Sequence, residues 1–141
     1  MSRIFWDTNI FIYLMEGSGE NHDLARTLLN RMLLRRDELI TSAMTLGELL
    51  VKPLEANRPD LAQRYEALLG SRGVSVVNFD RDAARIYAKL RLDRNIRPPD
   101  AIQLSCAAAA ATNLFVTNDA RLSNKTVSGI DFIVPLEKVF L

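Results

Sequence analysis

Short apolar runs alternate along this chain with longer segments whose apolar residues recur at helical spacing. Short runs rich in β-branched and aromatic residues are typical of buried strands, whereas apolar residues three or four positions apart indicate helices. The predicted strands are residues 4–6, 39–41, 74–79, 114–117 and 132–134. The predicted helices are residues 9–15, 44–51 and 100–111, with further helices beginning near residues 21–23, 59–60 and 80–82. This alternation predicts an α/β protein with three α/β/α layers and a mostly parallel sheet of about five strands.

Capping and breaking residues predict where several helices begin and end. Asn21 or Asp23 is expected to cap the second helix, and Asp80 or Asp82 a later one, because short polar side chains satisfy the first free N–H groups. Pro53 is expected to stop the helix of residues 44–51, because the residue before a proline avoids helical angles.

Length and composition narrow the class of protein. The 141 residues predict one domain, residues 1–141, and a hydrophobic fraction of 48% is enough for a core. A single cysteine, Cys106, excludes an internal disulfide and favours a reducing, cytoplasmic location. No apolar run is long enough for a membrane span, so no membrane association is expected. With one His and one Cys, any bound metal would be a hard ion held by carboxylates.

Acidic residues stand where predicted elements meet. Asp7 and Asp119 follow predicted strands, Asp100 opens an almost wholly apolar helix, and Glu48 interrupts another apolar segment. Ligands of such folds bind beyond the carboxyl ends of the strands, where these side chains converge if the strands are neighbours. Taken singly, Asp7 and Asp100 are also explained as helix caps, Asp119 as a turn former and Glu48 as part of a wet face.

Gathering four carboxylates is electrostatically unfavourable. Two of them about 5 Å apart repel by roughly 3 kcal/mol at an effective dielectric near 20. Arg97, Arg121 or Lys52 could supply the balancing charge, but Mg²⁺ or Mn²⁺ does so better, since both prefer oxygen ligands. Such an ion activates water and neutralises phosphate charge, which is what hydrolysis of a phosphodiester requires.

Four motifs together resemble those of the PIN-domain ribonucleases, and most closely the VapC-type toxins of bacterial toxin–antitoxin pairs. The motifs are Asp7-Thr8-Asn9, Thr45-Leu46-Gly47-Glu48, Pro99-Asp100-Ala101-Ile102-Gln103 and Thr117-Asn118-Asp119. Their order, spacing and coverage of the chain all fit.

The resemblance implies a Mg²⁺- or Mn²⁺-dependent endoribonuclease that cleaves RNA. It implies a metal-binding and catalytic quartet of Asp7, Glu48, Asp100 and Asp119, in which Asp7 and Asp100 match the residues most often assigned as direct ligands. It implies supporting polar roles for Thr8, Asn9, Thr117 and Asn118. It also implies a homodimer and a cognate antitoxin protein that silences the toxin.

The net charge of only +1 means that RNA must be held by local groups. Arg91, Arg94 and Arg97 precede Asp100 and are candidate phosphate contacts, although a solvated helix face explains each of them equally well. Phe11 or Tyr13, in the almost wholly apolar segment of residues 9–15, is a candidate residue for an interface with a protein partner.

Other functions remain open. A phosphatase with an aspartyl nucleophile would usually need a second aspartate at position 9, which is Asn9, and a receiver domain would need a lysine where Asn118 stands. A catalytically inactive module that binds RNA or protein, and a housekeeping RNA-processing nuclease, are the remaining alternatives.

Overall fold

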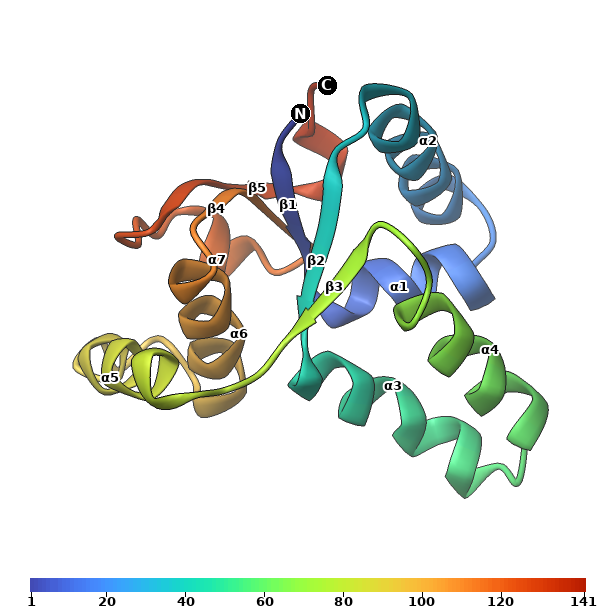
Figure 1. Ribbon diagram of the computed structural model, residues 1–141, viewed down its shortest axis with the longest axis horizontal. Coiled ribbons are helices and arrows are strands. Elements are labelled where there is room, and N and C mark those ends of the chain that lie inside the picture. The colour runs from blue at the N-terminus through green and yellow to red at the C-terminus, as the bar shows by residue number, and fades with distance from the viewer.

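A computed structural model describes all 141 residues and consists of one five-stranded sheet with helices on both faces (Figure 1). The strands are β1 (Arg3–Trp6), β2 (Glu38–Ser42), β3 (Val74–Val77), β4 (Thr112–Thr117) and β5 (Ile130–Pro135). The helices are α1 (Thr8–Glu16), α2 (Glu20–Arg35), α3 (Ala43–Glu55), α4 (Pro59–Leu69), α5 (Arg81–Leu90), α6 (Pro98–Ala109) and α7 (Ala120–Ser123), followed by a 3₁₀ turn, η1 (Leu136–Lys138). All strand pairs are parallel, in the order β3-β2-β1-β4-β5, which confirms the predicted fold class.

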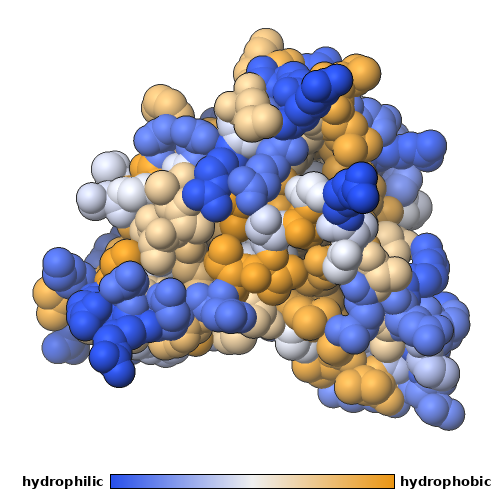
Figure 2. Space-filling model, viewed as in Figure 1, coloured by the Kyte–Doolittle hydropathy of each residue, from blue (hydrophilic) through white to orange (hydrophobic).

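The alternation of side chains along β1 divides the core into two layers. Ile4 and Trp6 pack into the layer that also holds α1 to α4, whereas Phe5 faces the layer of α5 to α7. Phe5 stacks on Phe115 of β4 with ring centroids 4.9 Å apart, which ties the two central strands together. Figure 1 shows the two groups of helices on opposite sides of the sheet, and Figure 2 shows the notch between their lower ends.

The register of the two central strands decides where the functional residues lie. Trp6 pairs with Val116, so Asp7 and Thr117 are the next residues at the same edge of the sheet. The backbone N–H of Asp7 donates to the carbonyl of Val116 at 3.0 Å and continues the pairing to this edge. The two strands that Asp7 and Asp119 follow, β1 and β4, are neighbours, so the condition for these side chains to converge is met.

Two predicted helix boundaries were wrong. Pro53 does not stop α3, which continues to Glu55 with Pro53 buried inside it. A proline removes one backbone hydrogen bond, and here the burial of its ring offsets that loss. Helix α2 begins at Glu20 after Gly19, whose φ of 80° turns the chain, and no side chain caps it.

Two other elements differ from their predicted ranges by a few residues: β3 ends at Val77 and not at residue 79, and α6 spans Pro98–Ala109 and not residues 100–111. Asp80 caps α5 by accepting a hydrogen bond from the N–H of Ala83 at 2.9 Å, as predicted. Asp100 lies in the first turn of α6, whose N-cap is Arg97, so Asp100 is not a cap. None of the helices has both the length and the apolar character that crossing a membrane requires.

Candidate active site

Asp7 stands at the junction of β1 and α1 and is held by both neighbouring elements. It is the N-cap of α1, and its Oδ1 accepts a hydrogen bond from the N–H of Thr8 at 2.8 Å. Its Oδ2 accepts a hydrogen bond from the hydroxyl of Thr117, at the end of β4, at 2.9 Å. The capping explanation for Asp7 is therefore correct, and the same carboxylate also faces the carboxyl edge of the sheet.

Thr117 links Asp7 to Asp119. While its hydroxyl donates to Asp7, the same oxygen accepts a hydrogen bond from the backbone N–H of Asp119 at 3.0 Å. Thr117 is fully buried, so this arrangement is built into the end of β4. The hydroxyl of Thr117 thus fixes Asp7 and Asp119 relative to each other.

Arg121 joins Asp119 to Asp100. Its Nε and Nη2 lie 3.0 and 2.5 Å from the two carboxylate oxygens of Asp119, which makes a two-pronged ion pair. The same Nη2 lies 3.6 Å from Oδ2 of Asp100, on α6. The side chains of Asp100 and Asp119 are 21% and 26% exposed, so both remain accessible to a ligand from solvent.

Glu48 belongs to a network of side-chain hydrogen bonds whose other members are buried polar residues. The hydroxyl of buried Thr8 donates to Oε1 of Glu48 at 2.7 Å. The side-chain amide of Gln103 donates to Thr45 at 2.7 Å and to Thr8 at 3.2 Å, and lies 3.5 Å from Oε1 of Glu48. The hydroxyl of Ser42 donates to the amide oxygen of Gln103. Glu48 itself is exposed, so it is anchored at one oxygen and open to solvent.

Gln103 is a residue that the motifs contained but to which sequence reasoning gave no role. It is only 2% exposed and follows Asp100 by one turn of α6. The signal for its role was its spacing, because residues three apart share one helix face. A buried amide on the face that carries Asp100 therefore connects α6 to Thr8, Thr45 and Glu48.

Burial and like charges act together on the acidic residues, which we call the acidic cluster: Asp7, Glu48, Asp100 and Asp119. Burial raises the pKa of Asp7 to about 6, with Asp100 and Glu48 adding to the rise and the hydrogen bonds from Thr117 and Thr8 opposing it. Burial and the charge of Asp119 raise the pKa of Asp100. The hydrogen bond from Arg121 lowers the pKa of Asp119. Asp100 therefore interacts electrostatically with each of the other three acids.

The donor chemistry of the acidic cluster fits a hard divalent cation. All its donors are carboxylate oxygens, the ligands that hard cations prefer, and the Asp7 carboxylate is held at the carboxyl edge of the sheet by Thr8 and Thr117. The side chains as they stand form no group of three or more His, Cys, Asp or Glu residues arranged to hold a metal ion. Arg121 forms ion pairs with Asp119 and Asp100, so its guanidinium group competes with a cation for these two carboxylates.

The remaining predicted residues lie as follows. Asn118 donates to the hydroxyl of Tyr13 at 2.5 Å, and burial and the charge of Asp7 raise the pKa of Tyr13, which therefore lies beside the acidic cluster. Asn9 is exposed at the start of α1. Phe11 is fully buried, so it is not available as an interface residue.

The three candidate RNA-binding arginines do not form one set. Arg91 donates from Nη1 to the carbonyl of Ile96 at 2.7 Å and so closes the turn between α5 and α6. Arg94 and Arg97 are exposed and line a cleft with Arg121.

Comparisons with known proteins agree with this architecture. The PIN domain family matches residues 4–127. None of the curated protein sequences is similar enough to match the chain. Among solved structures, a chain of VapBC2 from Rickettsia felis, bound to a promoter DNA fragment, is 16% identical with a TM-score of 0.75, and the alignment covers 94% of this chain and 98% of that one.

Two further structures have the same fold. A chain of DNA-bound VapBC from Salmonella typhimurium is 22% identical with a TM-score of 0.74, over 96% of this chain and 99% of that one. VapC20 from Mycobacterium tuberculosis, a toxin that cleaves the sarcin–ricin loop, is 18% identical with a TM-score of 0.69, over 89% of this chain and 97% of that one. Since the family match spans most of the chain and the fold is shared with these PIN-like chains, the protein belongs to the PIN domain family.

Proposed function

We propose that this protein is a divalent-metal-dependent endoribonuclease that cleaves RNA phosphodiester bonds and acts as the toxin of a toxin–antitoxin pair. The observation that carries the proposal is the acidic cluster, whose four carboxylates come from β1–α1, α3, α6 and β4–α7. Thr117 links Asp7 to Asp119, and Arg121 links Asp119 to Asp100. Membership of the PIN domain family and structural similarity to chains of VapBC complexes support it.

The chain's own residues divide the work. Asp7, Asp100 and Asp119 would hold one or two Mg²⁺ or Mn²⁺ ions. When bound, the cation supplies a polarised water and positive charge at the phosphate. Glu48, anchored through one oxygen by Thr8, uses its free oxygen to orient the attacking water and accept its proton. Thr117 keeps Asp7 and Asp119 in fixed relation throughout.

The test is cleavage of RNA in the presence and absence of Mn²⁺. We expect Asp7→Asn and Asp100→Asn each to lower the cleavage rate by about a hundredfold or more, because a neutral amide is a poorer ligand than a carboxylate. Asp60→Asn is the matched control, since Asp60 is an exposed acid on α4 that pairs only with Arg58. Thermal melts confirm that each variant is folded, and wild-type cleavage by either active-site variant would refute the mechanism.

The second candidate is a catalytically inactive module that binds RNA or protein. The ion pairs of Arg121 favour it, because they balance the charge of Asp119 and Asp100 without a bound metal. The two functions differ in their response to metal. An intact metal site raises the melting temperature when Mn²⁺ is added, as any ligand of the native state does. An inactive module would show neither this rise nor Mn²⁺-dependent cleavage.

The toxin role implies two protein partners, a cognate antitoxin and a second copy of this chain. The solved structures support the first, because several of them are of VapBC or other toxin–antitoxin complexes. A small adjacent gene that encodes a DNA-binding protein would favour the toxin role over housekeeping RNA processing.

A further inference from the structure

A polar cleft of about 490 Å³ lies beside the acidic cluster, and no apolar residue lines it. Its lining, which we call the basic cleft, consists of Arg94, Asn95, Arg97, Arg121, Asn124 and Lys125. Its volume is within the range of ordinary ligand sites. Most ligand sites are lined mainly by apolar and aromatic side chains, so a lining of four cations and two amides points to an unusually charged ligand.

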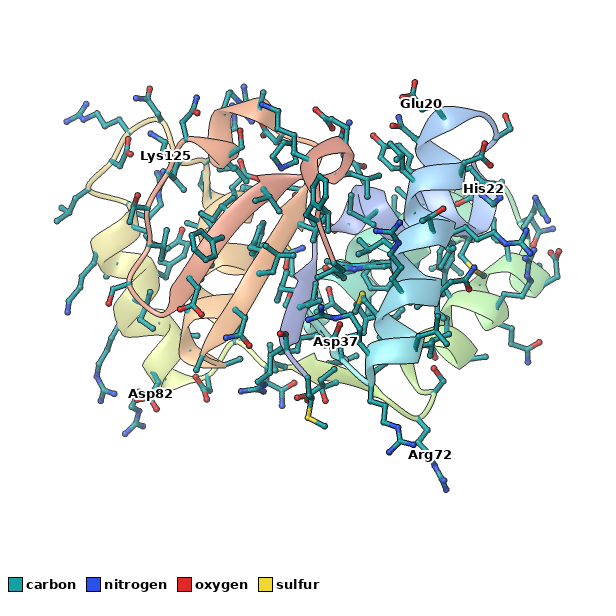
Figure 3. All side chains as sticks on the ribbon, turned by 90° about the horizontal axis from the view of Figure 1, so that it is seen from above. Glu20, His22, Asp37, Arg72, Asp82 and Lys125 are labelled. Carbon is teal, nitrogen blue, oxygen red and sulfur yellow. The ribbon has the colours of Figure 1, made fainter.

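Two separate segments of the chain build the basic cleft. Arg94, Asn95 and Arg97 come from the connection between α5 and α6, whereas the other three residues come from α7 and the loop that follows it. An ion pair between Lys125 and Asp93, 2.8 Å long, joins the two segments. The cleft is therefore a formed feature of the fold, and Figure 3 shows Lys125 on the loop that borders it.

The cations of the basic cleft are only partly neutralised. Arg121 pairs with Asp119 and Asp100, and Lys125 pairs with Asp93. Neither Arg94 nor Arg97 has a carboxylate within ion-pair distance, so neither guanidinium group forms an ion pair. In a protein whose net charge is only +1, this is a local concentration of positive charge beside a concentration of negative charge.

The basic cleft is continuous with the acidic cluster. Arg121 belongs to both, since it lines the cleft and holds two of the acids. The charge of Arg97 lowers the pKa of Asp100 and of Asp119, which places its guanidinium near these carboxylates. If one phosphate of a polyanion lay at the acidic cluster, the next phosphates along it would thus lie beside Arg97 and Arg94.

We propose that the basic cleft binds the phosphate groups of single-stranded RNA on one side of the bond to be cut, without reading the bases. This inference rests on the proposed function and extends it to the mode of substrate binding. Guanidinium groups bind phosphate oxygens in two-pronged fashion, and the amides of Asn95 and Asn124 add donors for phosphate or ribose. The cleft has no aromatic side chain on which a base could stack.

The experiment measures binding of a fluorescein-labelled, 12-nucleotide RNA of mixed sequence by anisotropy, in EDTA so that no metal-dependent cleavage occurs. The test variant is Arg94→Gln with Arg97→Gln, and the matched control is Arg26→Gln with Arg72→Gln. Both pairs are exposed arginines without ion-pair partners, so the two variants lose the same charge. Figure 3 shows Arg72 at the opposite end of the molecule from Lys125.

We expect the test variant to bind the RNA about tenfold more weakly, while the control binds within about twofold of the wild type. The slope of log K against log salt should become shallower by about 1.4 in the test variant, which corresponds to two lost phosphate contacts on a single strand. Oligo(A), oligo(C) and oligo(U) should bind the wild type with similar affinity.

Three results would overturn the proposal: unchanged binding in the test variant, an equal loss in both double variants, or a strong preference for one homopolymer. The proposed function is tested separately by Mn²⁺-dependent cleavage of the same RNA. Cleavage by the wild type with unchanged binding in the test variant refutes only the basic cleft. Binding through the cleft without any cleavage refutes only the nuclease.

Discussion

At the scale of single residues, the buried carboxylate of Asp7 is unfavourable for the stability of the fold that holds it. Burial outweighs the two hydrogen bonds that Asp7 accepts, and the pKa of its carboxyl group rises to about 6. Because this pKa is higher in the native state than in the unfolded chain, the native state gives up stability as pH rises from about 4 to about 6. At neutral pH the ionised Asp7 is an unfavourable group in the protein without a bound cation.

We therefore expect Asp7→Asn to stabilise the protein in metal-free buffer. The free energy of unfolding at pH 7 should rise by about 1–3 kcal/mol, since the pKa change of about two units is an upper bound on the gain. The difference from the wild type should be small near pH 4 and grow up to about pH 6. Urea denaturation across this pH range measures it.

Asp119→Asn is the companion variant with the opposite sign. The hydrogen bond from Arg121 lowers the pKa of Asp119, so ionised Asp119 stabilises the native state above its unfolded pKa and this contribution is lost as pH falls. Asp119→Asn should therefore lower stability at pH 7. Equal destabilisation by both variants would contradict the account given for Asp7.

At the scale of elements, the connection between β4 and β5 passes very close to helix α6. Gly129 has a φ of 97°, and a Cβ atom there would lie 2.7 Å from the carbonyl oxygen of Ala108. The start of β5 also lies beside β4 at this point. The backbone N–H of Thr112, at the start of β4, donates a hydrogen bond to the carbonyl of Gly129. The position therefore requires glycine for two reasons, its backbone angle and its lack of a side chain.

We expect Gly129→Ala to lower the free energy of unfolding by about 2–4 kcal/mol, measured by urea denaturation. Gly73→Ala is the matched control, because Gly73 has a similar φ of 87° but nothing within 4 Å of its Cβ position. Its loss should be about 1 kcal/mol, from the backbone angle alone. Similar losses at both positions would show that the contact with α6 has no effect.

The helix boundaries show which local signals were strong enough to predict an element. Asp80 and the Pro59 start of α4 were predicted correctly, because a cap or a first-turn proline acts within a few residues. Pro53 misled the prediction, since its burial in α3 depends on packing that no local pattern reveals. The start of α2 at Gly19 was missed for the related reason that backbone angle, and not a capping side chain, turns the chain there.

At the scale of the whole molecule, the small net charge conceals two oppositely charged regions side by side. The acidic cluster and the basic cleft meet at Arg121, which binds acids of the first and lines the second. From the net charge alone, we could predict only that any RNA would be held by a local group of basic residues. Arg94 and Arg97 were named from their closeness to Asp100 in sequence, but the part played by Arg121, Lys125 and the two asparagines required the fold.

The assembly proposed for the whole chain can be tested in solution. Several large apolar side chains are exposed, among them Leu54 at 68% and Phe132 at 69%, and Figure 2 shows apolar atoms across the middle of one face. We expect light scattering over a series of protein concentrations to give a mass approaching twice that of one chain at the highest concentration. A mass equal to one chain at every concentration would exclude the homodimer.

The sequence by itself determined the class of fold and singled out four acids as candidates for the site. Strand and helix periodicity are local properties, and parallel strands place whatever follows them at one edge, so Asp7 and Asp119 could be brought together without coordinates. Asp100 and Glu48 were singled out because one opens an almost wholly apolar helix and the other interrupts an apolar segment. The family resemblance then joined all four acids in one expected quartet.

Only the tertiary structure decided how those acids are held. Gln103 connects Thr8, Thr45 and Glu48, and Thr117 and Arg121 link the acids to one another. Each of these contacts depends on the distance and direction between side chains from different elements, which the packing of α3, α6 and α7 against the sheet sets. A sequence pattern records which face of an element is apolar, but the atoms that meet across two faces are fixed by how closely and at what angle the elements pack.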